Sequence, residues 1–143
     1  MDAAFPAPAH AKLSRIRPTG AGGAGSVPAL LRAEGLIALA VAVTAYRYGG
    51  GTWLMFGVMF LLPDVSMLGY IASPRIGARI YNLGHTYIAP ALLALAGVVM
   101  TAPVLHLMAL IWAAHIGFDR LLGYGLKYPS AFGATHLGSV RDA

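Results

Sequence analysis

Five side chains that can bind a metal ion or transfer a proton interrupt stretches of sequence that are otherwise strongly hydrophobic. They are Glu34, Asp64, His85, His115 and Asp119. A charged group inside a lipid bilayer costs several kcal/mol unless it is paired or faces a polar cavity. Carboxylates combined with neutral imidazoles suit zinc, iron or manganese. The five residues therefore indicate a divalent metal site, provided that the fold brings them together.

The spacing of these residues suggests a role for each. His115 and Asp119 are four residues apart, so they share one face of a helix and form one half of the predicted site. His85 and Asp64 are the expected ligands of the other half, and Glu34 is the candidate general base or fifth ligand. The chain contains neither an HExxH nor an ExxH motif. The prediction therefore depends on convergence of the residues and not on a known ligand signature.

Four further residues are candidates for supporting roles. Tyr81 and Asn82 lie about one helical turn before His85, and we expect them to orient its imidazole. Arg120 is expected to pair with a carboxylate at the membrane edge. His136 becomes a further ligand or acid/base group if the C-terminal segment folds back toward the site. The alternative is that His136 belongs to an amphipathic surface tail.

The composition is that of an integral membrane protein. Hydrophobic residues make up 58% of the chain and charged residues 10%, whereas soluble domains have about 45 to 50% apolar and about 25% charged residues. The absence of cysteine excludes disulfides and thiolate metal ligands. The basic residues are scattered over the ends of the hydrophobic stretches, so we expect no nucleic-acid interface.

The hydrophobic stretches predict an all-α fold, a four-helix transmembrane bundle. A hydrocarbon layer of roughly 30 Å requires about 20 apolar residues per helix. Pro63 and Pro90 lie inside expected spans and should kink them, because proline removes a backbone donor. The expected spans cover residues 28–46, 52–72, 80–100 and 103–122.

The segments outside the spans set the expected orientation. Residues 1–27 are rich in Ala, Pro and Gly and predict a disordered basic arm, and residues 123–143 predict an interfacial tail on the cytoplasmic side. Nine of the ten Lys and Arg residues fall on one side of the four-span topology. By the positive-inside rule, both termini are cytoplasmic in an inner (plasma) membrane. The same topology places all five candidate residues at a similar depth on the cytoplasmic side.

Three interpretations of the polar residues compete. The first is a membrane-embedded, metal-dependent hydrolase acting on a lipid or other membrane-borne substrate. The second is a small proton- or ion-coupled transporter. The third is a non-catalytic membrane subunit, in which the polar groups form structural pairs and rows of small residues pack against a second protomer or a partner protein. The rows contain Ala38 and Ala42 in the first span, and Ala109, Ala113 and Gly117 in the fourth.

Three groups of residues carry a resemblance to a known family. They are Pro63, Asp64, Ser66, Met67, Leu68, Gly69 and Tyr70; Tyr81, Asn82, His85, Tyr87 and Pro90; and His115, Ile116, Gly117, Asp119, Arg120, Gly123, Tyr124, Gly125, Leu126, Lys127, Tyr128, Phe132, Thr135, His136, Leu137 and Gly138. Residues 30–138 thereby resemble the small bacterial integral membrane proteins catalogued as domain of unknown function 4260. The resemblance implies a multi-span bacterial inner-membrane protein. It carries over no catalytic residue, because no activity is established for the family.

Overall fold

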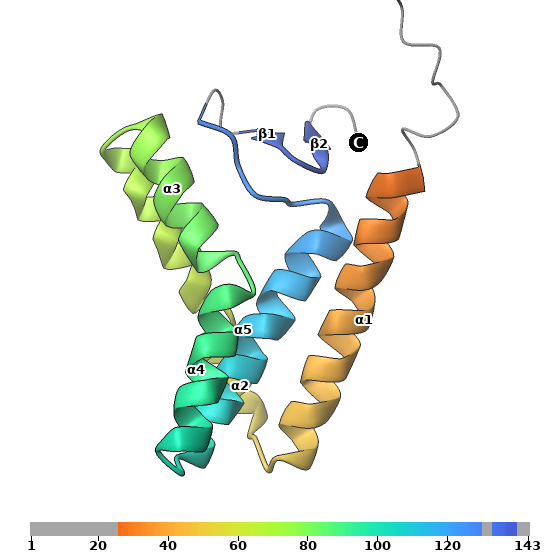
Figure 1. Ribbon diagram of the computed structural model, residues 1–143, viewed down its shortest axis with the longest axis vertical. Coiled ribbons are helices and arrows are strands. Elements are labelled where there is room, and N and C mark those ends of the chain that lie inside the picture. Colours follow the sequence, from red (N-terminus) through yellow and green to blue (C-terminus); the bar gives the residue numbers. More distant parts are fainter. Residues whose placement is uncertain (1–25, 130–132, 140–143) are drawn as a thin grey trace, which may run out of the picture.

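The structure, a computed structural model, describes residues 26–129 and 133–139. The predicted N-terminal arm therefore lies almost wholly outside the described residues. The described residues form five α-helices, one 3-10 helix and a short hairpin (Figure 1). The elements are α1 (Ser26–Tyr48), α2 (Trp53–Phe60), η1 (Leu62–Ile71), α3 (Pro74–Gly84), α4 (Ile88–Val99), α5 (Pro103–Leu122), β1 (Ala134–Thr135) and β2 (Gly138–Ser139).

The helices account for three or four membrane spans, and the helical fold class predicted from the sequence is confirmed. Within the described part of the chain, three segments are long and apolar enough to cross a bilayer: Val27–Tyr48, Trp53–Ile71 and Pro103–Leu122. The second of them combines α2 and η1. It changes from α to 3-10 geometry next to Pro63, which occupies the first turn of η1. A fourth span exists if α3 and α4, which are bent by 41°, are counted as one.

The third expected span differs most from the structure. Its first helix starts at Pro74, earlier than the expected residue 80, because the Ser73 side chain accepts a hydrogen bond from the Ile76 amide and caps it. The bend lies between Gly84 and Ile88. Pro90 accounts for its position, since a proline removes the bond to the carbonyl four residues earlier and its ring clashes there. The bend leaves His85 at the end of a helix, where its side chain can reach a neighbouring element.

Helices α1 and α5 pack closely through glycine. A Cβ atom at Gly35 would lie 2.8 Å from the Gly117 carbonyl oxygen, and a Cβ at Gly117 would lie equally close to the Gly35 carbonyl oxygen. Ala42 and Ala109, from the two predicted small-residue rows, are buried. These small residues therefore pair two helices of the same chain.

Helices α2 and α4 pack against α5, whereas η1 and α3 form a second packing unit. η1 and α3 pack mainly against each other, and in Figure 1 they extend away from α1 and α5. α5 ends at Gly123, whose φ of +90° is readily adopted by glycine. The chain then crosses toward α3, where Lys127 forms a β-bridge with Thr135 of the hairpin. The C-terminal segment is thus in contact with the polar end of the bundle.

Candidate metal centre

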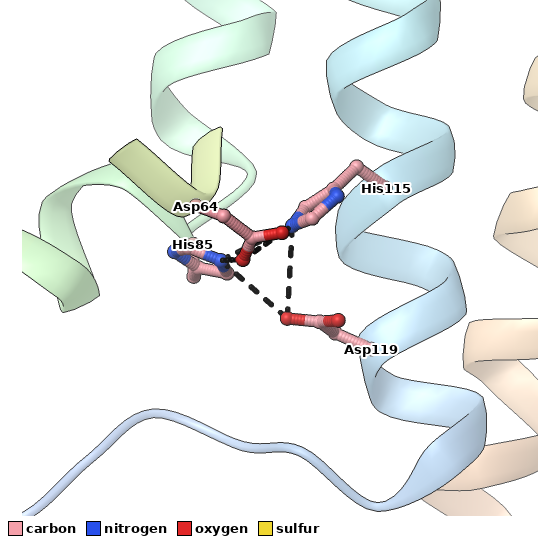
Figure 2. Close-up of side chains that lie close together, drawn as sticks. All are labelled: Asp64, His85, His115 and Asp119. Carbon is pink, nitrogen blue, oxygen red and sulfur yellow. Dashed lines mark hydrogen bonds and ion pairs between the residues drawn. The ribbon is translucent and has the colours of Figure 1, made fainter. Parts of the chain in front are cut away.

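Four of the five residues predicted from the sequence converge on one point (Figure 2). Asp64 comes from the first turn of η1, His85 from the bend after α3, and His115 and Asp119 from successive turns of α5. One possible ligand atom from each residue lies within 4.8 Å of the other three. The group joins the η1 and α3 unit to α5.

The distances between the facing atoms match the edges of a small coordination polyhedron. The two Nε2 atoms of His85 and His115 are 3.2 Å apart. The His85 Nε2 lies 3.5 Å from Asp64 Oδ1 and 3.4 Å from Asp119 Oδ2, and the corresponding distances from the His115 Nε2 are 3.6 Å and 3.8 Å. Metal–ligand bonds of 2.0 to 2.2 Å in a tetrahedron place ligand atoms about 3.3 to 3.6 Å apart. The five edges that involve a histidine lie around this range, and the two carboxylate oxygens lie within 4.8 Å of each other.

Hydrogen bonding fixes the orientation of the His85 ring. Its Nδ1 lies 3.0 Å from the carbonyl oxygen of Tyr81. A carbonyl oxygen can only accept, so Nδ1 carries the hydrogen and donates it, and Nε2 presents a lone pair to the other three residues. Metal-binding histidines are typically held in this way, with the second ring nitrogen bonded to a carbonyl or carboxylate.

The group is mainly buried and attracts positive charge. His85 and His115 are 3% and 2% exposed, whereas the side chains of Asp119 and Asp64 are 15% and 41% exposed. The His85 Nε2 is a hydrogen-bond acceptor because the ring hydrogen is on Nδ1. The two carboxylate oxygens are acceptors without a hydrogen when the carboxylates are ionised. Acceptors that face one another repel unless a cation or a proton lies among them. The exposed fraction of Asp64 shows the side from which the group can be approached.

Tyr81 connects both halves of the site, as its position before His85 suggests. Its hydroxyl donates to Asp119 Oδ2 at 3.2 Å. Its ring stacks on the His85 imidazole with centroids 3.8 Å apart and an interplanar angle of 12°. Asn82 is directed elsewhere. Its amide bonds both the carbonyl and the N–H of Lys127, at 2.9 Å and 2.7 Å, and so attaches the C-terminal segment to α3.

Lys127 also belongs to this network. From the sequence we expected it only in the interfacial tail, residues 123–143. The residue is 7% exposed, and its Nζ lies 4.8 Å from the centre of the Tyr81 ring. Burial lowers the pKa of its ammonium group, and the Asp119 carboxylate partly opposes that shift. The ring belongs to Tyr81, 46 residues away on α3, so the turn around Lys127 gave no sequence signal for this contact.

Three of the residues considered from the sequence lie outside the group. Glu34 is exposed on α1, because the neighbouring Gly35 is the residue that faces α5 and each residue turns the helix by about 100°. Arg120 lies 3.0 Å from the His136 Nε2, and the His136 Nδ1 accepts from the Leu126 amide at 2.9 Å. Both residues therefore hold the C-terminal segment. Partial desolvation and the Arg120 guanidinium lower the pKa of His136.

Comparison with known proteins identifies one family. No curated protein and no solved structure matches the chain. The family described as a domain of unknown function, DUF4260, matches residues 28–140, a range that contains all four converging residues. The chain belongs to the DUF4260 family.

Proposed function

We propose that the protein is a membrane-embedded, divalent metal-dependent hydrolase, with Asp64, His85, His115 and Asp119 as the metal ligands. The observation that carries the proposal is the convergence of four ligand atoms within 4.8 Å of one another. The five distances that involve a histidine are 3.2 to 3.8 Å, and the His85 lone pair is directed inward. Two imidazoles and two carboxylates suit zinc, iron or manganese.

The chemistry proposed for this centre is hydrolysis of an ester or phosphoester. A metal held by the four residues would need a fifth position for water, on the exposed side of Asp64. There it would lower the pKa of that water and polarise the bond under attack. The water oxygen adds to the carbonyl carbon or phosphorus, and the bond to the leaving alcohol breaks. The proton released by the water passes through the second oxygen of Asp64 to the leaving alkoxide. Asp64 is chosen for this transfer because it is the most exposed ligand.

The distribution of basic residues supports an orientation for the centre. An even number of spans places the start of α1 and the end of α5 on the same side of the molecule, as in Figure 1. We propose that this side is cytoplasmic in a bacterial inner membrane, because nine of the ten Lys and Arg residues are assigned to it. The centre then acts on substrate in the cytoplasmic leaflet.

The test is the metal content of purified protein. The wild type is expected to hold one equivalent of zinc, iron or manganese, and His115→Ala is expected to lose it. The matched control is His106→Ala, which removes a histidine from the same helix and outside the four-residue group. Failure to find stoichiometric metal in the wild type, before or after loading with each of the three metals, would overturn the proposal and favour a non-catalytic membrane subunit.

A further inference from the structure

An apolar hollow lies beside the candidate metal centre. Its inner part is a cavity of about 110 Å³ between α2, η1, α4 and α5. Its outer part is a groove along η1, α3 and α4. The two parts are contiguous because they share Leu62, Pro63, Leu93 and Trp112.

The hollow borders the four-residue group on three elements at once. Pro63 lines it and directly precedes Asp64, and Gly84 lines it and directly precedes His85. Trp112 lines it one helical turn before His115, and its indole donates to the Gly84 carbonyl at 2.7 Å. Ser66 in the same groove lies 3.5 Å from the His85 ring. The lining of the hollow therefore includes residues next to the candidate ligands, and Ser66 connects it to the His85 ring.

The position of the hollow in the bilayer determines what can fill it. Its rim is formed by large apolar side chains that remain exposed, namely Leu62, Leu83 and Leu92, at 52%, 70% and 61% exposure. These residues belong to the spans or to the bent helix pair that completes the fourth span. At such positions the protein contacts hydrocarbon. Filling the hollow with water is unfavourable, because it would expose the apolar lining to water.

We propose that the hollow binds one acyl chain of a phospholipid whose polar end lies at the metal centre. The substrate class is then a membrane phospholipid, and the hydrolysed bond is an ester or phosphoester of its head region. This inference deepens the proposed function and depends on it for the polar end only. The acyl chain needs nothing but the apolar lining, whereas a phosphate or carbonyl oxygen needs the cation.

The first experiment tests the acyl chain. Protein reconstituted in vesicles of phosphatidylcholine and phosphatidylglycerol is extracted into maltoside and weighed by native mass spectrometry. The wild type is expected to retain one phospholipid per chain. Ala89→Phe and Ala96→Phe, which fill the groove at two positions of its α4 lining, are expected to lose it. Leu95→Phe, on the lipid-facing side of the same helix and outside the hollow, is expected to keep it. Equal retention in all four proteins overturns the proposal.

The second experiment tests the polar end with Mn²⁺ as the metal. In the wild type, Mn²⁺ is expected to broaden the phosphorus NMR signal of the retained lipid beyond detection, because the phosphate lies close to the ion. Asp64→Asn is expected to retain the lipid without broadening. A bound lipid whose phosphorus signal is unaffected in Mn²⁺-loaded wild type overturns the assignment of the polar end. A wild type that retains lipid but binds no metal instead rejects the proposed function and leaves the hydrocarbon site standing.

Discussion

The close contact between α1 and α5 makes Gly117→Ala the sharpest test of the packing. A Cβ at residue 117 would lie 2.8 Å from both the Gly35 carbonyl oxygen and the Leu39 amide nitrogen. Both atoms are backbone, so no flexible side chain can move aside, and the two helices must separate. Overpacking of this kind costs about 1 to 3 kcal/mol.

Gly57→Ala is the matched control for this change. Gly57 lies inside α2, and a Cβ there would meet nothing within 4 Å. Both substitutions replace glycine within a helix, which by itself stabilises by about 0.5 to 1 kcal/mol. The difference between the two variants therefore isolates the packing cost. Gly117→Ala should be less stable than Gly57→Ala by about 1 to 3 kcal/mol in unfolding by sodium dodecyl sulfate from mixed micelles.

Metal content adds a second readout of the same variant. His115 and Asp119 lie two residues to either side of Gly117, so their side chains are rotated about 200° from it along α5. The contact with α1 and the candidate metal centre are thus on different faces of one helix. We expect Gly117→Ala to keep the metal content of the wild type. Stability equal to that of Gly57→Ala would refute the close contact, and loss of metal would refute the separation of the two faces.

Three further predictions concern the surroundings of the site. Tyr81→Phe removes only the hydroxyl that donates to the Asp119 carboxylate. Metal affinity, measured by competition with a chelating dye, should fall about 10- to 100-fold. An unchanged affinity would exclude a role of Tyr81 in orienting Asp119. Asn82→Leu removes two hydrogen bonds to the Lys127 backbone and should accelerate hydrogen exchange at the Lys127 amide. An exchange rate equal to that of the wild type would show that other contacts hold the C-terminal segment. The lowered pKa of His136 predicts that its neutral ring, which accepts from the Leu126 amide beside Arg120, is present above about pH 6.5. This bond is lost as the pH falls through that lowered pKa. Proteolysis of the C-terminal segment should therefore increase at acidic pH in the wild type and be independent of pH in His136→Gln.

The spans and most of the site were predictable because both depend on local features. Hydropathy marks membrane helices directly, and Pro63 marks the change of helix type in the second span. The positive-inside count placed Asp64, His85, His115 and Asp119 at one depth, which is the condition for the convergence seen in the structure. The bend before α4 was expected from Pro90. The start of α3 at Pro74 was not, because the apolar pattern gave no weight to the capping side chain of Ser73.

The orientation of α1 shows what such reasoning misses. A helix that is apolar nearly all round has no hydrophobic stripe to indicate which side faces its neighbours. Packing decides the rotation instead: Gly35 and Ala42 lie seven residues apart on the face toward α5 and allow close approach. Glu34 is one residue removed from this face and is exposed. The predicted depth alone therefore included Glu34 in the site, whereas the rotation of α1 excludes it.

The arrangement of the ligands also has a consequence for the stability of the fold. η1 and α3 pack mainly against each other and contribute Asp64 and His85, whereas α5 contributes His115 and Asp119. A cation held by all four would cross-link the two units at their junction. Metal binding to such a site contributes directly to the folding free energy, since separated units offer only two ligands each. Tyr81 stacks on His85 and donates a hydrogen bond to Asp119 of α5, so its contacts also hold the two units together. The same metal centre would then take part in catalysis and attach the η1 and α3 unit to α5, because each side of the junction contributes two of its residues.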